Sequence, residues 1–177
     1  VRDMSGPLAE WIAAQRWFAA KSRRIVATRV EDRIAVGGAT VNVVRVGLDD
    51  GAVHTYVVPL REATTPSDAF EDPGFCRALL DLIGISGRVE GDHGALVGRA
   101  STGFPRDLPT DLPARRVSGE QSNTSVTFGE SLIVKHFRRV VTGVNPELEI
   151  GRHLTEHVAF PHAPRLAGAL EYVTADG

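Results

Sequence analysis

A polar loop between two apolar runs offers the donors that phosphate oxygens need. Residues 118–125 read SGEQSNTS. Small residues let backbone N–H groups approach an anion closely, and hydroxyl groups add further donors. A solvent-exposed hairpin turn would have a similar composition. The sequence contains neither GxxxxGK[ST] nor GxGxxG, so this is a different kind of candidate phosphate loop. The residues suited to the role are Ser118, Gly119, Ser122, Asn123, Thr124 and Ser125.

One lysine in an apolar strand could complete such a site. Residues 132–137 (LIVKHF) alternate so that Lys135 shares a face with Ile133 and Phe137. Lysine is depleted in strands, although an edge strand often carries one to prevent aggregation. Because Lys135 follows the polar loop by one hairpin, we expect its ammonium group to reach the same phosphates.

A strand lysine needs an acidic partner to hold it extended, and two glutamates compete for that role. Asn145 and Pro146 suit the N-cap and the first position of a helix running to about residue 158. Periodicity favours Glu147, which shares the apolar face expected to pack against the core. Glu149 falls on the polar face, one step deeper in the helix. Acids in a first turn also complement the helix dipole without any further role.

The elements around this hairpin predict an α+β protein. Residues 8–20 have the pattern of a short amphipathic helix, and three β-rich runs follow at 25–36, 40–48 and 53–60, with a turn at 49–51. Asp72 and Pro73 begin a second helix, which Gly84 ends. Residues 102–113 carry three prolines and have linker composition. We therefore expect two units, residues 1–110 and 111–177, both with antiparallel strands.

Composition excludes several classes of protein. The chain has 177 residues and a formal net charge of −2, so bulk charge does not indicate nucleic-acid binding. It has one cysteine, Cys76, which we expect to be a small buried hydrophobe without a disulfide. The N-terminal residues lack a signal pattern, and no apolar run is long enough to span a bilayer. These features favour a soluble protein of the cytoplasm that does not act at a membrane.

A second motif is an alternative site. His153, Glu156 and His157 spell HxxEH, the pattern of inverted zinc proteases. That chemistry needs a third ligand well downstream. The outer face of a helix explains the same residues without a metal, so we expect none to be bound there.

The segment GEQSNTSVTFGESLIVKHFRRVVTGVNPELEIGRHLTE, continued by FPHAPRLAGALEY, resembles the intermediate subdomain of bacterial maltokinases. These kinases are related to aminoglycoside phosphotransferases. The N-terminal WIAAQRWFAAKSRRI is similar to the start of the maltokinase N-terminal cap domain. The resemblance implies a cap at residues 1–110 and, at residues 111–177, an incomplete lobe like the N-lobe of protein kinases.

The resemblance also implies an activity and a set of site residues. Maltokinases phosphorylate maltose at its anomeric hydroxyl with ATP and Mg²⁺. The family's phosphate loop corresponds to Gln121, Ser122, Asn123, Thr124 and Ser125, and its phosphate-contacting lysine corresponds to Lys135. For the acid that pairs with this lysine, the family pattern favours Glu149, with Glu147 second and against the periodicity.

Kinase-like enzymes place the catalytic aspartate and the metal ligands in a lobe that follows the hinge. No HxD or DxD pattern with a following asparagine occurs here, so we expect no catalytic residue, no metal ligand and no turnover from this chain alone. An aminoglycoside or amino-sugar phosphotransferase and a non-catalytic nucleotide-binding or regulatory module are the alternatives. We also expect the strand at 167–173 to leave an unpaired edge that could mediate self-association.

Overall fold

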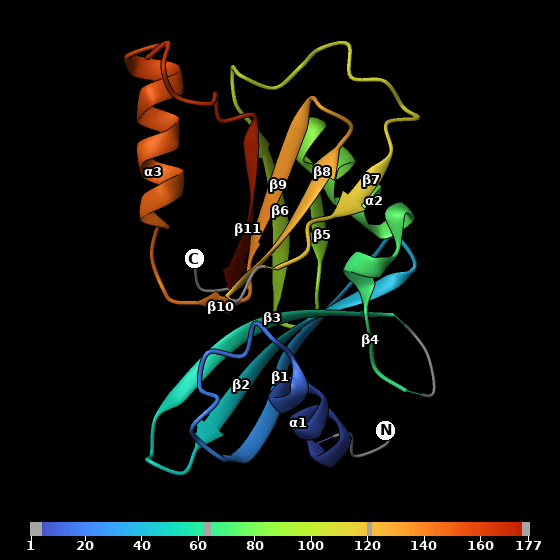
Figure 1. Cartoon of the computed structure of the whole chain (residues 1–177), viewed down its shortest axis with the longest axis vertical. Helices are drawn as coiled ribbons and strands as arrows, with labels where there is room; N and C mark the ends of the chain where they lie inside the picture. The colour runs from blue at the N-terminus through green and yellow to red at the C-terminus, as the bar shows by residue number, and fades with distance from the viewer. Residues whose placement is uncertain (1–4, 62–64, 120–121, 175–177) are drawn as a thin grey trace.

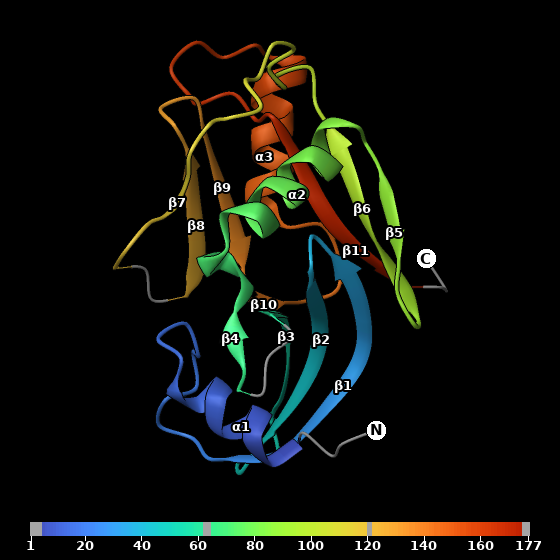
Figure 2. The ribbon, with the colours of Figure 1, turned by 90° about the vertical axis from the view of Figure 1, so that its right-hand side faces the viewer.

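The structure is a computed structural model of the chain and describes residues 5–61, 65–119 and 122–174. Within these residues it contains three antiparallel sheets and few helices, which confirms the α+β prediction. One sheet forms the lower half of the molecule in Figure 1, and the other two stand above it. Figure 2 shows helix α2 (Pro73–Gly84) between the two upper sheets.

The lower sheet follows the three β-rich runs of the sequence. Gly51 has a φ of +84° in the turn between its second and third strands, a conformation that favours glycine. The strands are β1 (Ile25–Val36), β2 (Ala39–Leu48), β3 (Val53–Arg61), β4 (Ser67–Asp68) and β10 (Arg139–Val140). Their order is β1-β2-β3-β10, with β4 also paired to β3.

Helix α1 (Ser5–Ala14) covers one face of this sheet and is shorter than the sequence predicted. Ile12 in the helix and Trp17 and Phe18 in the following turn are all buried. They pack against alternate residues of β2 and β3, among them Val44 and Tyr56. This cluster is the core of the lower half.

Helix α2 begins where Asp72 and Pro73 predict. The Asp72 side chain accepts a hydrogen bond from Gly74 N, and Pro73 is the first helical residue. Cys76 is buried on this helix, and burial raises the pKa of its thiol to about 11. The prediction of a buried cysteine is therefore confirmed.

The upper sheet on one side of α2 is ordered β11-β6-β5. A Cβ on Gly98 would lie 2.0 Å from the carbonyl oxygen of Leu82, so glycine lets α2 lie directly on this sheet. Its strands are β5 (Arg88–Glu90), β6 (Gly94–Ala100) and β11 (Gly168–Thr174).

The third sheet is ordered β7-β8-β9 and carries the loop and lysine singled out in the sequence. Val126 and Phe128 are buried against α2 and the lower sheet in one continuous apolar cluster. The strands are β7 (Ala114–Arg116), β8 (Asn123–Phe128) and β9 (Leu132–Phe137).

Strands pair across the division expected near residue 110. β10 pairs with β3, and β11 pairs with β6 along its whole length, from Gly168 opposite Ala100 to Thr174 opposite Gly94. The other edge of β11 has no partner strand within the described residues. The two-domain division and self-association through this edge both stay predictions.

Asp32 also ties the lower sheet to the upper one. Its carboxylate accepts a hydrogen bond from the Tyr172 hydroxyl at 2.9 Å and further bonds from backbone N–H groups, including those of Asp92 and His93. Burial opposes its ionisation, but these donors together outweigh burial and lower the pKa of Asp32. Burial of the Tyr172 hydroxyl and its hydrogen bond to the negatively charged Asp32 raise the pKa of Tyr172 to about 12.

Candidate functional site

The candidate site is the open face of the β8–β9 hairpin. The register places Ser125 directly opposite Lys135 and Asn123 opposite Phe137, so these side chains share a face. Ile133 continues that face and is 64% exposed. Leu132 and Val134 point the other way and pack against the core. The alternation predicted for this strand is confirmed.

Lys135 forms an ion pair with Glu147. The lysine Nζ lies 2.7 Å from Oε2 and 2.9 Å from Oε1 of Glu147, and it is 5.0 Å from the centre of the Phe137 ring. The preference for Glu149 as this partner was wrong. Two residues correspond to about 200° around a helix, so Glu149 projects from the opposite side. It is exposed and makes no ion pair within the described residues.

The helix cap places Glu147 in the first turn of the helix. The Asn145 side chain accepts a hydrogen bond from Glu147 N at 2.8 Å and begins helix α3 (Pro146–Arg152). A π-helical turn, His153–His157, continues it. The ion pair with Lys135 brings this first turn next to β9.

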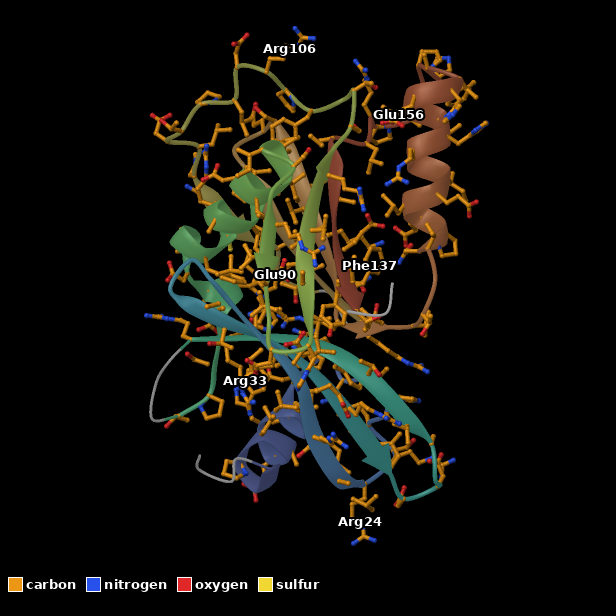
Figure 3. The ribbon with its side chains drawn as sticks, turned by 180° about the vertical axis from the view of Figure 1, so that it is seen from behind. Arg24, Arg33, Glu90, Arg106, Phe137 and Glu156 are labelled. Atoms are coloured by element: carbon orange, nitrogen blue, oxygen red, sulfur yellow. The ribbon has the colours of Figure 1, made fainter. Side chains whose placement is uncertain are left out.

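The apolar face of α3 does not pack into the core, contrary to the sequence prediction. Ile150 is 59% exposed and Val158 is 52% exposed. Helix α3 stands beside β11 in Figure 1, and Figure 3 shows Glu156 at its far end, away from the sheets. Periodicity therefore favoured the glutamate that pairs with Lys135, but it wrongly predicted that Ile150 and Val158 on the same helix face are buried.

The polar loop presents part of its donor set to solvent. Ser118, Gly119 and Ser122 are exposed, and Gly119 has a φ of +100°. Gln121 lies outside the described residues. Ser125 lies on the same face of the hairpin as Lys135, and its side chain is buried.

Thr124 is turned to the other face of the hairpin, and its hydroxyl accepts a hydrogen bond from Arg138 Nε at 2.9 Å. Its contribution to a phosphate site stays a prediction, as do those of the other loop residues.

Arg138 is the residue that sequence reasoning missed at this site. It directly follows β9 and has no solvent exposure. Its Nη2 donates to Asp68 Oδ2 at 2.5 Å. Burial lowers the pKa of this arginine to about 10, so it remains charged at neutral pH. The only signal in the sequence was the FRR run, which does not reveal that one of its two arginines is buried.

His136 lies beside Arg138 on the same side of the hairpin. Its Nε2 is 3.2 Å from the carbonyl oxygen of Val57, and its ring centre is 4.8 Å from that of Phe70. The residue keeps some solvent exposure, yet desolvation, assisted by the charge of Arg138, lowers its pKa to about 3. A neutral imidazole therefore donates to Val57 at physiological pH.

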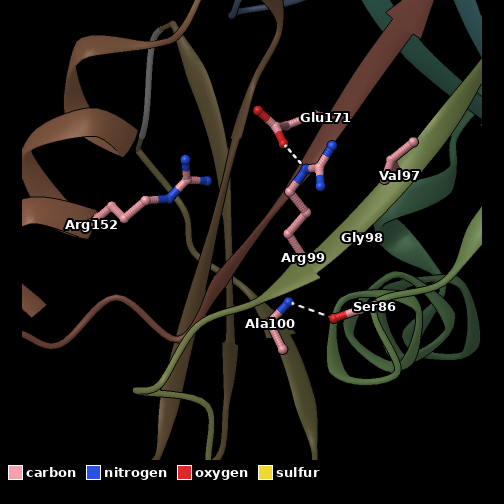
Figure 4. A pocket seen from close by; sticks show the side chains of 7 residues that line it. All are labelled: Ser86, Val97, Gly98, Arg99, Ala100, Arg152 and Glu171. Atoms are coloured by element: carbon pink, nitrogen blue, oxygen red, sulfur yellow. Dashed lines mark hydrogen bonds and ion pairs between the residues drawn. The ribbon is translucent and has the colours of Figure 1, made fainter. Parts of the chain in front are cut away.

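Two hollows border the upper sheets. One, of about 360 Å³, lies between the end of α1 and the polar loop and includes Gln15, Arg16 and Arg116 in its lining. The other, of about 530 Å³, lies between α3 and the β6–β11 pair. Figure 4 shows Arg152 approaching it from α3, while Arg99 is paired with Glu171 at 2.6 Å.

The described residues contain no group of three or more His, Cys, Asp or Glu side chains that could hold a metal ion. In the HxxEH segment the rings of His153 and His157 stack with their centres 5.4 Å apart. No helix in the described part of the chain has the length and apolar content needed to cross a membrane.

Comparison with known families identifies the larger part of this architecture. The family model of the maltokinase N-terminal cap domain matches residues 11–104, more than half of the chain. The chain belongs to this family. The prediction of a maltokinase cap at the N-terminus is confirmed, and the matched residues run from the end of α1 through strands β1 to β6 and include α2. The hairpin with Lys135 lies beyond the matched residues.

Proposed function

We propose that this chain is the N-terminal part of an ATP-dependent sugar kinase in which the β8–β9 hairpin contacts the nucleotide phosphates. The observation that carries the proposal is the pairing of Lys135 with Glu147 at 2.7 Å on the open face of the hairpin. This arrangement holds an ammonium group extended in the way that kinase-like enzymes require of their strand lysine. Membership of the maltokinase cap family supports maltose as the phosphoryl acceptor.

The donor set on the hairpin suits phosphate oxygens. Lys135 provides a cation, Ser122 an exposed hydroxyl, and Gly119 a backbone that can approach an anion closely. A magnesium site does not fit the described residues in the same way, because Glu147 is already engaged by Lys135. The ion would have to be held by the nucleotide and by residues outside the described part of the chain.

Binding of inorganic tripolyphosphate to the purified chain tests the proposal. Lys135→Ala removes the cation, and we expect about a tenfold or larger loss of affinity, as for a charge-assisted contact. Arg139→Met is the matched control, since Arg139 is an exposed arginine close by on β10. Isothermal titration at low ionic strength measures both. Equal affinity of the original chain and Lys135→Ala would contradict the proposal.

A coupled ADP-release assay with maltose or glucosamine addresses catalysis. We expect the chain by itself to give no turnover above Lys135→Ala. Turnover above that variant would show that the residues needed for phosphoryl transfer are present in these 177 residues.

A further inference from the structure

One buried guanidinium group connects the cap to the candidate phosphate site. Arg138 directly follows the strand that carries Lys135, and its side chain is fully buried. Nε donates to Thr124 on β8, and Nη2 donates to Asp68 on β4. The group therefore bridges the hairpin and the lower sheet, at the junction where Figure 3 places Phe137.

The cap encloses this group with aromatic rings as well as with a carboxylate. The guanidinium carbon of Arg138 lies 5.0 Å from the ring centres of both Trp17 and Phe70. Stacking on two rings fixes the plane of a guanidinium, and the pairing with Asp68 fixes its direction. Two separate segments of the cap, one with Trp17 and one with Asp68 and Phe70, thus determine where Arg138 lies.

Both ends of the polar loop are tied to the same carboxylate. Arg116 comes just before the loop, and its Nη1 is 3.4 Å from Asp68 Oδ2. Thr124 lies at the far end of the loop and is held through Arg138. Asp68 itself is 3% exposed, and its other oxygen accepts a hydrogen bond from Phe70 N. The cap therefore holds the loop at its entry and at its exit.

Stability alone does not require this arrangement. Burying an ion pair costs desolvation energy, and apolar side chains of similar volume often serve a core as well or better. Arg138 Nη1 is buried without a hydrogen-bond partner in the described residues, which adds to the cost. A buried pair that is expensive in this way is better suited to defining a position than to stabilising the fold.

We propose that Arg138 is a positioning residue through which the cap holds the polar loop and Lys135 in register for phosphate binding. This inference rests on the proposed function for the identity of the ligand. It also assigns a role to the cap: the cap sets the geometry of the phosphate-binding hairpin through Asp68, Trp17 and Phe70.

A double variant separates positioning from stability. Arg138→Met alone would leave the Asp68 charge buried and could unfold the chain. Asp68→Asn combined with Arg138→Met removes both charges, and the asparagine oxygen can still accept from Phe70 N. We expect this double variant to unfold at a urea concentration close to that of the original chain. Arg139→Met is again the exposed control, and Thr124→Val is a second, nearly isosteric test of the same link.

Two readouts report on the hairpin. The first is the affinity for inorganic tripolyphosphate. The second is NMR of the chain after reductive ¹³C-methylation of its lysines, which keeps their charge. The chain has only two lysines, Lys21 and Lys135, so Lys21 serves as the internal reference. In the double variant and in Thr124→Val we expect the Lys135 signal to shift and the affinity to fall roughly fivefold or more, the usual size of a coupling between sites.

The outcomes separate the two proposals. A folded double variant or Thr124→Val with the original affinity and the original Lys135 signal would overturn the positioning role. If the original chain does not bind tripolyphosphate at all, the proposed function fails, and the Lys135 signal then decides the positioning role alone. Arg139→Met should leave both readouts unchanged, and a shift there would mean that they respond to any loss of charge nearby.

Discussion

The ion pair between Lys135 and Glu147 lies on an exposed surface, so its value is in geometry more than in stability. The glutamate side chain is 62% exposed, and such pairs contribute about 0–1 kcal/mol. Glu147→Gln should therefore leave the free energy of unfolding nearly unchanged while it shifts the ¹³C-methyl signal of Lys135. Glu149→Gln is the matched control and should shift nothing. A shift caused by Glu149→Gln but not by Glu147→Gln would restore the partner that family resemblance favoured.

His136 makes the fold sensitive to acid. Its pKa is about 6.5 when unfolded and about 3 when folded, so below pH 6.5 the unfolded chain binds a proton that the folded chain does not. Stability is complete above pH 6.5 and is lost progressively as the pH falls toward 3.

His136→Gln keeps a donor for Val57 and removes this titration. Between pH 7 and pH 5 we expect the original chain to lose about 1–2 kcal/mol more than the variant in urea unfolding. Carboxylates titrate in both proteins, so the difference isolates His136. Parallel losses in the two proteins would show that the imidazole is protonated in the folded chain.

At the scale of elements, helices α1 and α3 have similar apolar patterns, but only the apolar face of α1 is buried. Ile12 in α1 has no solvent exposure, whereas Ile150 in α3 is 59% exposed. Ile12→Ala should cost about 2–5 kcal/mol because it leaves a cavity, while Ile150→Ala should change stability by less than about 0.5 kcal/mol. Urea unfolding of the two variants measures both effects. A large loss for Ile150→Ala would mean that α3 packs against the rest of the chain in solution.

The elements that depend on local chemistry were predictable from the sequence. The Asp72–Pro73 helix start, the turn at Gly51 and the alternation along β9 all follow from residues within a few positions of one another. Pairing of β10 with β3 depends on a two-residue strand that no periodicity can reveal. The open face of α3 could not be predicted either, because periodicity identifies an apolar face but not what covers it.

In the candidate site, too, features set by nearby residues were predictable from the sequence, and features set by distant residues were not. The cap at Asn145 and the helical spacing of Glu147 were present in the sequence, and only family resemblance favoured Glu149. The burial of Arg138 depends on Asp68 and Trp17, which are 70 or more residues away in the chain. A contact of that range leaves no mark on the local pattern.

At the scale of the whole molecule, two cores differ in how they depend on the chain beyond residue 110. The lower core, which contains Ile12, Trp17 and Tyr56, is built entirely from residues before that point. The upper core around α2 also includes Val126 and Phe128 of the hairpin, and β6 has β11 as a neighbour. Loss of the chain beyond residue 110 therefore removes part of the upper core, whereas in the lower half it removes the contacts of β10 and Arg138 with β3 and Trp17 but no member of the apolar core.

A fragment of residues 1–110 should accordingly fold in part. We expect amides of β2 to keep their protection from hydrogen exchange, because β2 still lies between β1 and β3 and α1 still covers their sheet. Amides of α2 and β6 should lose protection relative to the full chain, since removal of β11, Val126 and Phe128 exposes their apolar contacts to water. Hydrogen exchange of the fragment and the full chain under identical conditions measures this difference. If α2 is equally protected in both, the upper core does not need the hairpin, and the division near residue 110 is a boundary between independently folding domains.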